Sequence, residues 1–319
     1  TDTGPVDNLD DWPPLYQDFI ADVGGSKFVD VGDAVMHYVE VGPADGQVVL
    51  LLHGIPTSAF LWRDVIPQLE GKRVIVPDLV GYGRSERPAG LPYTPQMQVE
   101  FLSTFVDSLG LSEVSLVVQD LGGPVGLGWA AANPEQVHSI VMFETLWSTL
   151  PGVESLPGEF ANLIAGLRTP GVGEMLVGEE NVFLNSLNGL TVTEMSQEVQ
   201  DVYRHPWQDA QERIDVILPS GPLAFPFPDT PVAVDFVSGY QQYLADDDVP
   251  KLVIDITPGV LSRITRPPTA GGEPIDAPQF AITEFANIER VSLDGSAHYV
   301  QEDIPEPLGN AINTFIDGL

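Results

Sequence analysis

The chain has 319 residues, of which 43% are hydrophobic and 18% are charged; this is the composition of a folded globular protein and excludes wholesale disorder. Its 46 acidic residues outnumber 13 basic ones, and the formal net charge of −33 argues against nucleic acid or anionic lipid as a partner. Such a charge either serves solubility alone or indicates adaptation to high salt, as in a halophilic or marine protein, because salt screens the self-repulsion of an acidic surface.

Two kinds of segment are not found in the sequence. No apolar run approaches the ~18 residues of a membrane-spanning helix, and the acidic N-terminal residues contain no signal-peptide core. The chain also lacks cysteine, which excludes disulfides and thiol chemistry. Composition leaves the oligomeric state open, and it leaves the compartment open between cytoplasm and export to the periplasm.

Residues 1–25 are acidic and contain proline, and we expect them to form an arm over the core. Beyond them, short apolar runs alternate with helical patterns such as Gln96–Leu109 and Gly123–Ala132. The runs that read as buried strands are Val48–His53, Arg73–Leu79, Val114–Gln119, Ser139–Phe143, Lys251–Ile256 and Arg290–Leu293. This alternation predicts an α/β fold with a mostly parallel central sheet and helices on both faces.

The alternation breaks between Leu146 and Asp248, where the sequence is rich in Gly, Pro and aromatic residues and mostly helical in pattern. We expect a core domain of residues 1–147 and 246–319, and a helical cap of residues 148–245. Ligands bind beyond the carboxyl ends of parallel strands, so an insertion at that edge would form a lid over a pocket.

Two loops at this edge carry a first set of candidate groups. The segment His53-Gly54-Ile55-Pro56 follows the first apolar run, and Gln119-Asp120-Leu121-Gly122-Gly123 follows the third. An acidic residue between a buried strand and a Gly pair has two readings, a nucleophile elbow or a helix N-cap, and the strand and glycines favour the elbow. The backbone N–H groups of Ile55 and Leu121 would then form an oxyanion hole.

The expected partners of Asp120 lie later in the chain. His298 alone among the five histidines follows a late strand in a loop of small residues, which is where the base falls when the nucleophile comes first. An acid must orient that base, and both Glu144 and Asp255 are carboxylates in apolar strands. Glu144 is favoured because it ends its strand at the carboxyl edge.

An aspartate nucleophile points to particular chemistry. A carboxylate is already ionised at neutral pH and can attack a saturated carbon to form an alkyl ester. The histidine then activates water against that ester. This logic favours a small apolar substrate, either a halogenated alkane that releases halide or an epoxide.

At these residues the sequence resembles the haloalkane dehalogenases, which have the α/β-hydrolase fold, and most closely the subfamily whose catalytic acid follows the strand here ending at Glu144. The resemblance covers nearly all of residues 25–319. Its motifs are HGIPTSAFLWRDVIPQL, VPDLVGYGRSERP, VVQDLGGPVGLGWA, NVFLNSLNGL, YRHPW, VPKLVIDITPGVL and GSAHYVQEDIPEPLG. It implies Asp120 as the nucleophile, His298 as the base and Glu144 as the acid. The sequence contains no metal-ligand cluster, phosphate-binding Gly loop or dinucleotide fingerprint, so we expect no cofactor and no metal.

The sequence departs from the family at the leaving-group site. The family holds the departing halide with an Asn at the position of Ile55 and a Trp at the position of Leu121, and neither aliphatic replacement can donate a hydrogen bond. Four side chains are candidate substitutes: Trp147, Trp62, Trp207 and Gln119. Two other readings stay open, an epoxide hydrolase using Tyr203, Tyr240 or Tyr243 as proton donors, and a binding protein without catalysis.

Overall fold

A computed structural model describes residues 8–267 and 271–319, so the first seven residues of the expected arm lie outside the described part. Its centre is an eight-stranded sheet in the order β1-β2-β4-β3-β5-β6-β7-β10. The first two pairings, β1 with β2 and β2 with β4, are antiparallel, and the remaining pairings are parallel. The strands are β1 (Lys27–Asp30), β2 (Val35–Val41), β3 (Val48–Leu52), β4 (Arg73–Pro77), β5 (Val114–Asp120), β6 (Val137–Thr145), β7 (Lys251–Pro258) and β10 (Ile288–Ser296).

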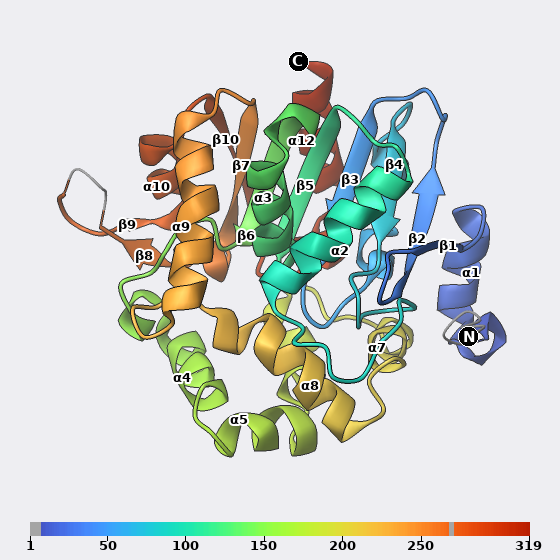
Figure 1. Ribbon diagram of the computed structural model, residues 1–319, viewed down its shortest axis with the longest axis horizontal. Helices are drawn as coiled ribbons and strands as arrows, with labels where there is room; N and C mark the ends of the chain where they lie inside the picture. The colour runs from blue at the N-terminus through green and yellow to red at the C-terminus, as the bar shows by residue number, and fades with distance from the viewer. Residues whose placement is uncertain (1–7, 268–270) are drawn as a thin grey trace.

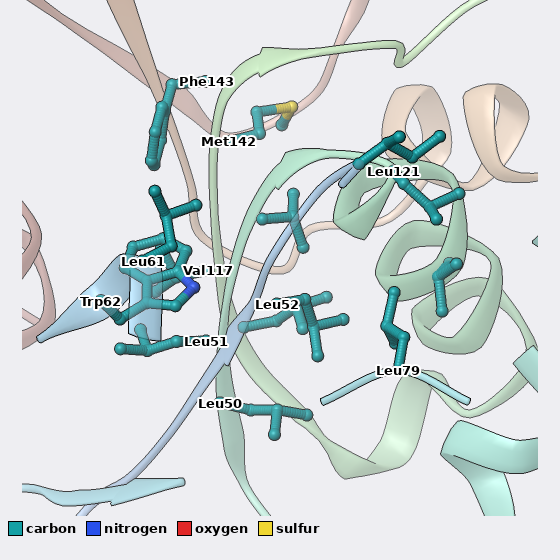
Figure 2. Close-up of a cluster of buried hydrophobic side chains, with 14 of the residues drawn as sticks. Leu50, Leu51, Leu52, Leu61, Trp62, Leu79, Val117, Leu121, Met142 and Phe143 are labelled. Atoms are coloured by element: carbon teal, nitrogen blue, oxygen red, sulfur yellow. The ribbon is translucent and has the colours of Figure 1, made fainter. Parts of the chain in front are cut away.

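All six apolar runs are strands of this sheet, which confirms the predicted mostly parallel architecture. Leu50, Leu51 and Leu52 of β3 and Val117 of β5 have no exposed surface, because helices cover both faces of the central strands. Figure 2 shows this core, in which the leucines of β3 lie close to Val117.

Helices α2, α3 and α9 lie on the near face of the sheet in Figure 1, and α12 lies on the far face. The helices outside the insertion are α1 (Pro14–Asp22), α2 (Pro95–Ser108), α3 (Gly122–Ala132), α10 (Ala277–Glu284), α11 (Val300–Asp303) and α12 (Pro305–Asp317). The described part of the N-terminal arm contains α1, whose Tyr16 and Phe19 lie against Phe60 with ring centroids 6.0 and 5.6 Å away.

Six α-helices lie between β6 and β7, in the segment predicted as an insertion. They are α4 (Gly158–Leu167), α5 (Val172–Glu174), α6 (Val182–Asn185), α7 (Gln197–Arg204), α8 (Ala210–Ser220) and α9 (Pro231–Asp246). Figure 1 shows α4, α5, α7 and α8 below the sheet, whereas α9 lies on its near face and packs against α3. No helix among residues 8–267 and 271–319 is long and apolar enough to span a bilayer.

Candidate active site

Asp120 stands on a sharp turn between β5 and α3. Its φ of 50° lies in the left-handed region, which a non-glycine residue adopts only at a cost that the surrounding structure must offset. Close packing around the turn requires two glycines. A Cβ on Gly54 would lie 2.3 Å from Cβ of Asp120, and one on Gly123 would lie 1.7 Å from the Thr145 hydroxyl, which donates to the Asp120 carbonyl.

The Asp120 carboxylate is held from two sides. The N–H of Ile55 donates to Oδ1 at 2.8 Å, and the N–H of Leu121 also hydrogen-bonds the carboxylate. On the other side Oδ2 lies 3.4 Å from Nε2 of His298. Burial alone would raise the pKa of Asp120, but His298 and the two N–H groups outweigh burial and hold that pKa below its ordinary value. Asp120 is therefore a carboxylate at neutral pH.

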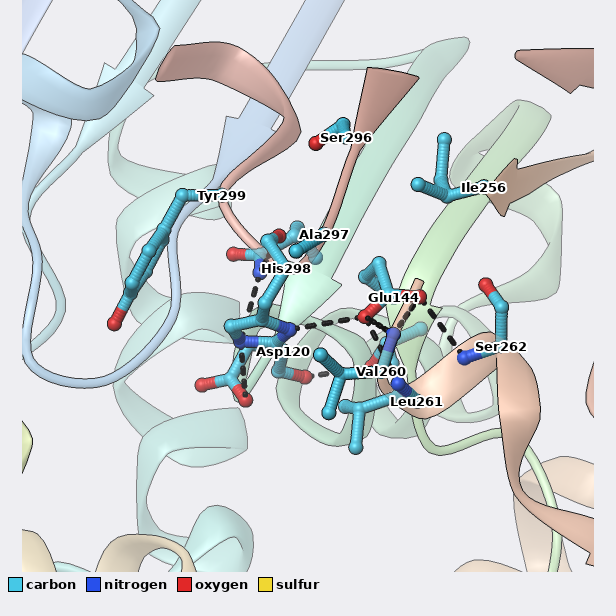
Figure 3. Close-up of polar contacts among 12 residues, drawn as sticks. Asp120, Glu144, Ile256, Val260, Leu261, Ser262, Ser296, Ala297, His298 and Tyr299 are labelled. Atoms are coloured by element: carbon cyan, nitrogen blue, oxygen red, sulfur yellow. Dashed lines mark hydrogen bonds and ion pairs between the residues drawn. The ribbon is translucent and has the colours of Figure 1, made fainter. Parts of the chain in front are cut away.

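His298 follows β10 and lies between two carboxylates, as Figure 3 shows. Its Nδ1 is 3.1 Å from Oε2 of Glu144, and its Nε2 faces Asp120. Burial lowers the pKa of the imidazole, but hydrogen bonds and charge from Asp120 and Glu144 raise it to about 9. The two neighbouring carboxylates thus favour the protonated form of the ring.

Glu144 is fully buried, has a φ of 43° near the end of β6, and is held by a row of backbone N–H groups. Val260, Leu261 and Ser262 donate to its two oxygens at 2.9 to 3.1 Å (Figure 3). This cradle after β7 was not predicted from the sequence. The only local signal is Gly259, whose positive φ of 61° turns the chain toward the carboxylate.

Asp255, the alternative acid, lies elsewhere. Its carboxylate accepts hydrogen bonds from Arg290 at 2.5 Å and from Arg263, and it makes no contact with His298. The structure therefore brings Glu144 to the imidazole, whereas Asp255 forms ion pairs with Arg263 and Arg290.

The three tryptophans considered as leaving-group donors do not line the cavity next to Asp120. Trp62 is packed in the core near Phe143, with ring centroids 6.1 Å apart (Figure 2), and Trp147 is also fully buried. The Trp207 indole donates to the carbonyl of Pro56 at 2.8 Å. Trp207 thus has its N–H engaged by the backbone, whereas the N–H groups of Trp62 and Trp147 are buried without a hydrogen-bond partner among the described residues and lie behind the residues that line the cavity.

Gln119, the fourth candidate, is fully buried behind the imidazole. Its amide nitrogen donates to the His298 carbonyl at 3.2 Å and lies 3.2 Å from His298 Nε2. The side chain contacts the base and is absent from the cavity wall.

A cavity of about 660 Å³ opens beside Asp120 and His298, a size typical of sites for small organic ligands. Most of its wall is aliphatic or aromatic, and Ile55 and Leu121 both contribute to it. Its hydroxyl-bearing residues are Ser186, Ser220 and Tyr299, each of which already donates to a backbone carbonyl.

The tyrosines considered for an epoxide reaction are also absent from this wall. The Tyr203 hydroxyl donates to Glu302, and the Tyr240 hydroxyl donates to the carbonyl of Leu146 at 3.0 Å. Tyr243 lies on α9, beside the sheet.

Comparison with known proteins places this geometry among related enzymes. A family model described as the alpha/beta hydrolase fold matches residues 47–220. Haloalkane dehalogenases of Agrobacterium fabrum and Mesorhizobium japonicum are 31% and 34% identical, over 92% and 90% of both chains. The crystal structure of the haloalkane dehalogenase DatA from Agrobacterium tumefaciens C58 matches with a TM-score of 0.81 at 30% identity, covering 92% of this chain and 96% of that one. The crystal structure of haloalkane dehalogenase DbeA from Bradyrhizobium elkani USDA94 matches with a TM-score of 0.82 at 28% identity, covering 92% of this chain and 98% of that one.

Proposed function

The chain belongs to the haloalkane dehalogenases, hydrolases of the α/β-hydrolase fold, and on that premise we propose that Asp120 is the nucleophile that forms an alkyl ester with its substrate. One observation carries the proposal. Asp120, His298 and Glu144 form a continuous line of contacts, and Asp120 and His298 lie on the wall of an apolar cavity.

In the first step Oδ2 of Asp120 attacks the carbon that bears the halogen. A C–O bond forms, the C–X bond breaks, and its electron pair leaves as halide. Oδ1 is already occupied by the N–H of Ile55, so Oδ2 is the oxygen available for attack. The low pKa of Asp120 keeps the nucleophile ionised without help from a base.

In the second step water attacks Cγ of Asp120 while Nε2 of His298 takes its proton. The charge that develops on Oδ1 is stabilised by the N–H groups of Ile55 and Leu121. Collapse breaks the bond between Cγ and the alkoxy oxygen, and this oxygen takes the proton held by His298 and leaves as the alcohol. Forming the ester removes the negative charge of Asp120, which is one cause of the high pKa of His298. Alkylation therefore lowers that pKa and prepares the imidazole to act as a base.

The leaving group departs next to the aliphatic side chains of Ile55 and Leu121, which line the cavity. A halide ion there loses two side-chain hydrogen bonds, each worth roughly 1.5–3 kcal/mol when made to a charged partner. We propose that the enzyme prefers bromoalkanes and iodoalkanes, whose leaving groups need less hydrogen-bond support than chloride.

The boundary between cap and core is also part of the proposal. The sequence predicted a cap of residues 148–245, but α9 packs against α3 and so covers the sheet. We therefore propose that the cap ends near residue 230, just before α9.

The net charge of −33 supports adaptation to high salt, which predicts a melting temperature that rises between ~0.1 and ~2 M NaCl.

The experiment is intact-mass spectrometry of His298→Phe. Without the base the ester forms but is not hydrolysed, so the variant should gain the mass of one alkyl group when mixed with bromoalkanes. Asp120→Asn is the matched control and should gain no mass. Epoxides of distinct masses are included in the same mixture.

Each outcome is decisive. An alkyl adduct on His298→Phe that is absent from Asp120→Asn supports the proposal. A mass gain equal to a whole epoxide would assign epoxide hydrolysis instead. A folded variant that forms no adduct would overturn Asp120 as nucleophile and favour a binding role.

A further inference from the structure

The turn that carries His298, residues Ser296–Asp303, is one of the places where the cap contacts the core. The backbone N–H groups of His298 and Tyr299 both donate to the carbonyl of Leu190, at 2.9 and 3.2 Å. Leu190 ends the short helix η7 (Leu187–Leu190) in the cap and lines the cavity. The backbone of the base is thus bonded directly to the cavity wall contributed by the cap.

A single side chain in the same turn joins these two segments a second time. On the cap side, the Asp303 carboxylate accepts hydrogen bonds from the N–H of Thr193 at 2.7 Å and from the N–H of Val192 at 2.9 and 3.0 Å. On the core side, its Oδ2 accepts from the Ser296 hydroxyl at 2.9 Å and from the N–H of Ala297 at 3.3 Å. Ala297 is the residue immediately before His298.

The donors on the two sides differ in origin but share one acceptor. Thr193 and Val192 belong to the insertion, whereas Ser296 ends β10 and Ala297 follows it directly. An ionised carboxylate offers lone pairs to all of them and donates nothing, which an amide of the same size does not reproduce. Replacing one oxygen by an NH₂ group would turn a donor toward N–H groups that need an acceptor.

We propose that Asp303 is a positioning residue that holds the His298 turn against cap segment 190–193 and thereby keeps Nε2 aligned with the water that attacks the ester. The inference rests on the proposed function, because in that mechanism alkylation needs Asp120 alone whereas ester hydrolysis needs His298. Loss of the Asp303 contacts should therefore slow the second step and spare the first.

Glu302 provides a matched control within the same helix. It too is a carboxylate that contacts the cap, through the Tyr203 hydroxyl of α7, and it pairs with Arg63 at 2.6 Å. It makes no hydrogen bond to residues 296–298. Glu302→Gln therefore weakens a contact between cap and core without removing a side-chain hydrogen bond to residues 296–298.

The test is rapid-quench intact-mass kinetics of the wild-type enzyme, Asp303→Asn and Glu302→Gln with one bromoalkane. The rise of the alkyl adduct measures alkylation, and its decay after the substrate is consumed measures hydrolysis. We expect Asp303→Asn to slow decay by about tenfold or more with little change in the rise. Ser296→Ala, which removes one donor, should slow decay less and in the same direction.

Unchanged ester decay in Asp303→Asn would overturn the inference, as would equal slowing in Glu302→Gln, which would indicate general loosening of the cap. If Asp303→Asn fails to fold, Ser296→Ala decides: slower decay with an unaltered rise supports the inference, and unaltered decay overturns it. Failure of the proposed function has a different signature, since His298→Phe would then form no adduct.

Discussion

The two sides of the cavity beside Asp120 are built differently. On the hydrolytic side, every charged group has named partners: Asp120 has His298 and the Ile55 N–H, and Glu144 has His298 and three backbone N–H groups. On the leaving-group side, the side chains of Ile55 and Leu121 offer no donor at all. Ile55 contributes to both sides, with its N–H on one and its side chain on the other.

This difference teaches which part of the site depends on backbone and which on side chains. In the proposed mechanism the oxyanion hole consists of main-chain N–H groups, so replacing the side chains at 55 and 121 would leave it in place. Stabilisation of a departing halide would depend on side chains, so the same replacements would remove it. The hydrolytic half can remain complete while the leaving-group half changes.

The largest effect is expected from breaking the hydrolytic side at its acid. Glu144→Gln removes the charge that orients and supports the imidazole, and we expect ester decay to fall by about 10³-fold, by analogy with loss of the acid in other triads. The measurement is the rate of decay of the alkyl adduct in a single turnover.

Asp255→Asn is the matched comparison for that change. Its carboxylate pairs with Arg263 and Arg290, so its loss should lower the melting temperature and leave ester decay close to that of the wild-type enzyme. Loss of turnover in Asp255→Asn with normal turnover in Glu144→Gln would contradict the assignment of the acid.

A smaller effect is expected from adding a donor to the aliphatic side. Ile55→Asn keeps the backbone N–H and introduces a side-chain amide, so alkylation by a chloroalkane should speed up by about tenfold, and by less for the matching bromoalkane. Ile55→Leu is the aliphatic control. Equal effects of Asn and Leu would show that the amide does not reach the departing halide.

The smallest effect is a shift in pH dependence. The pKa of His298 is about 9 while Asp120 is ionised, and esterification removes one of the charges that raise it. Hydrolysis needs the neutral imidazole, so ester decay should rise with pH through a pKa below 9. Single-turnover decay measured from about pH 5 to 10 checks this, and an apparent pKa at or above 9 would count against relief by esterification.

Much of the fold and the two central site residues could be predicted from the sequence because their signals are local. Each buried parallel strand is a continuous apolar run, and Asp120 lies between such a run and the glycines that allow its turn. His298 is marked by its place after the last strand. The sequence could not show whether Trp62, Trp147 or Trp207 lines the cavity, because a tryptophan in the core and one on the cavity wall leave no different local signal.

The sequence by itself determined six strands of the sheet, the turn at Asp120, the late histidine and the loss of side-chain donors at 55 and 121. Only the tertiary structure showed that Glu144 meets the imidazole whereas Asp255 meets Arg263 and Arg290. It also brought Thr193 to Asp303 across 110 positions of sequence. Such pairings are fixed by packing between elements, whereas strand and turn signals are fixed by neighbouring residues.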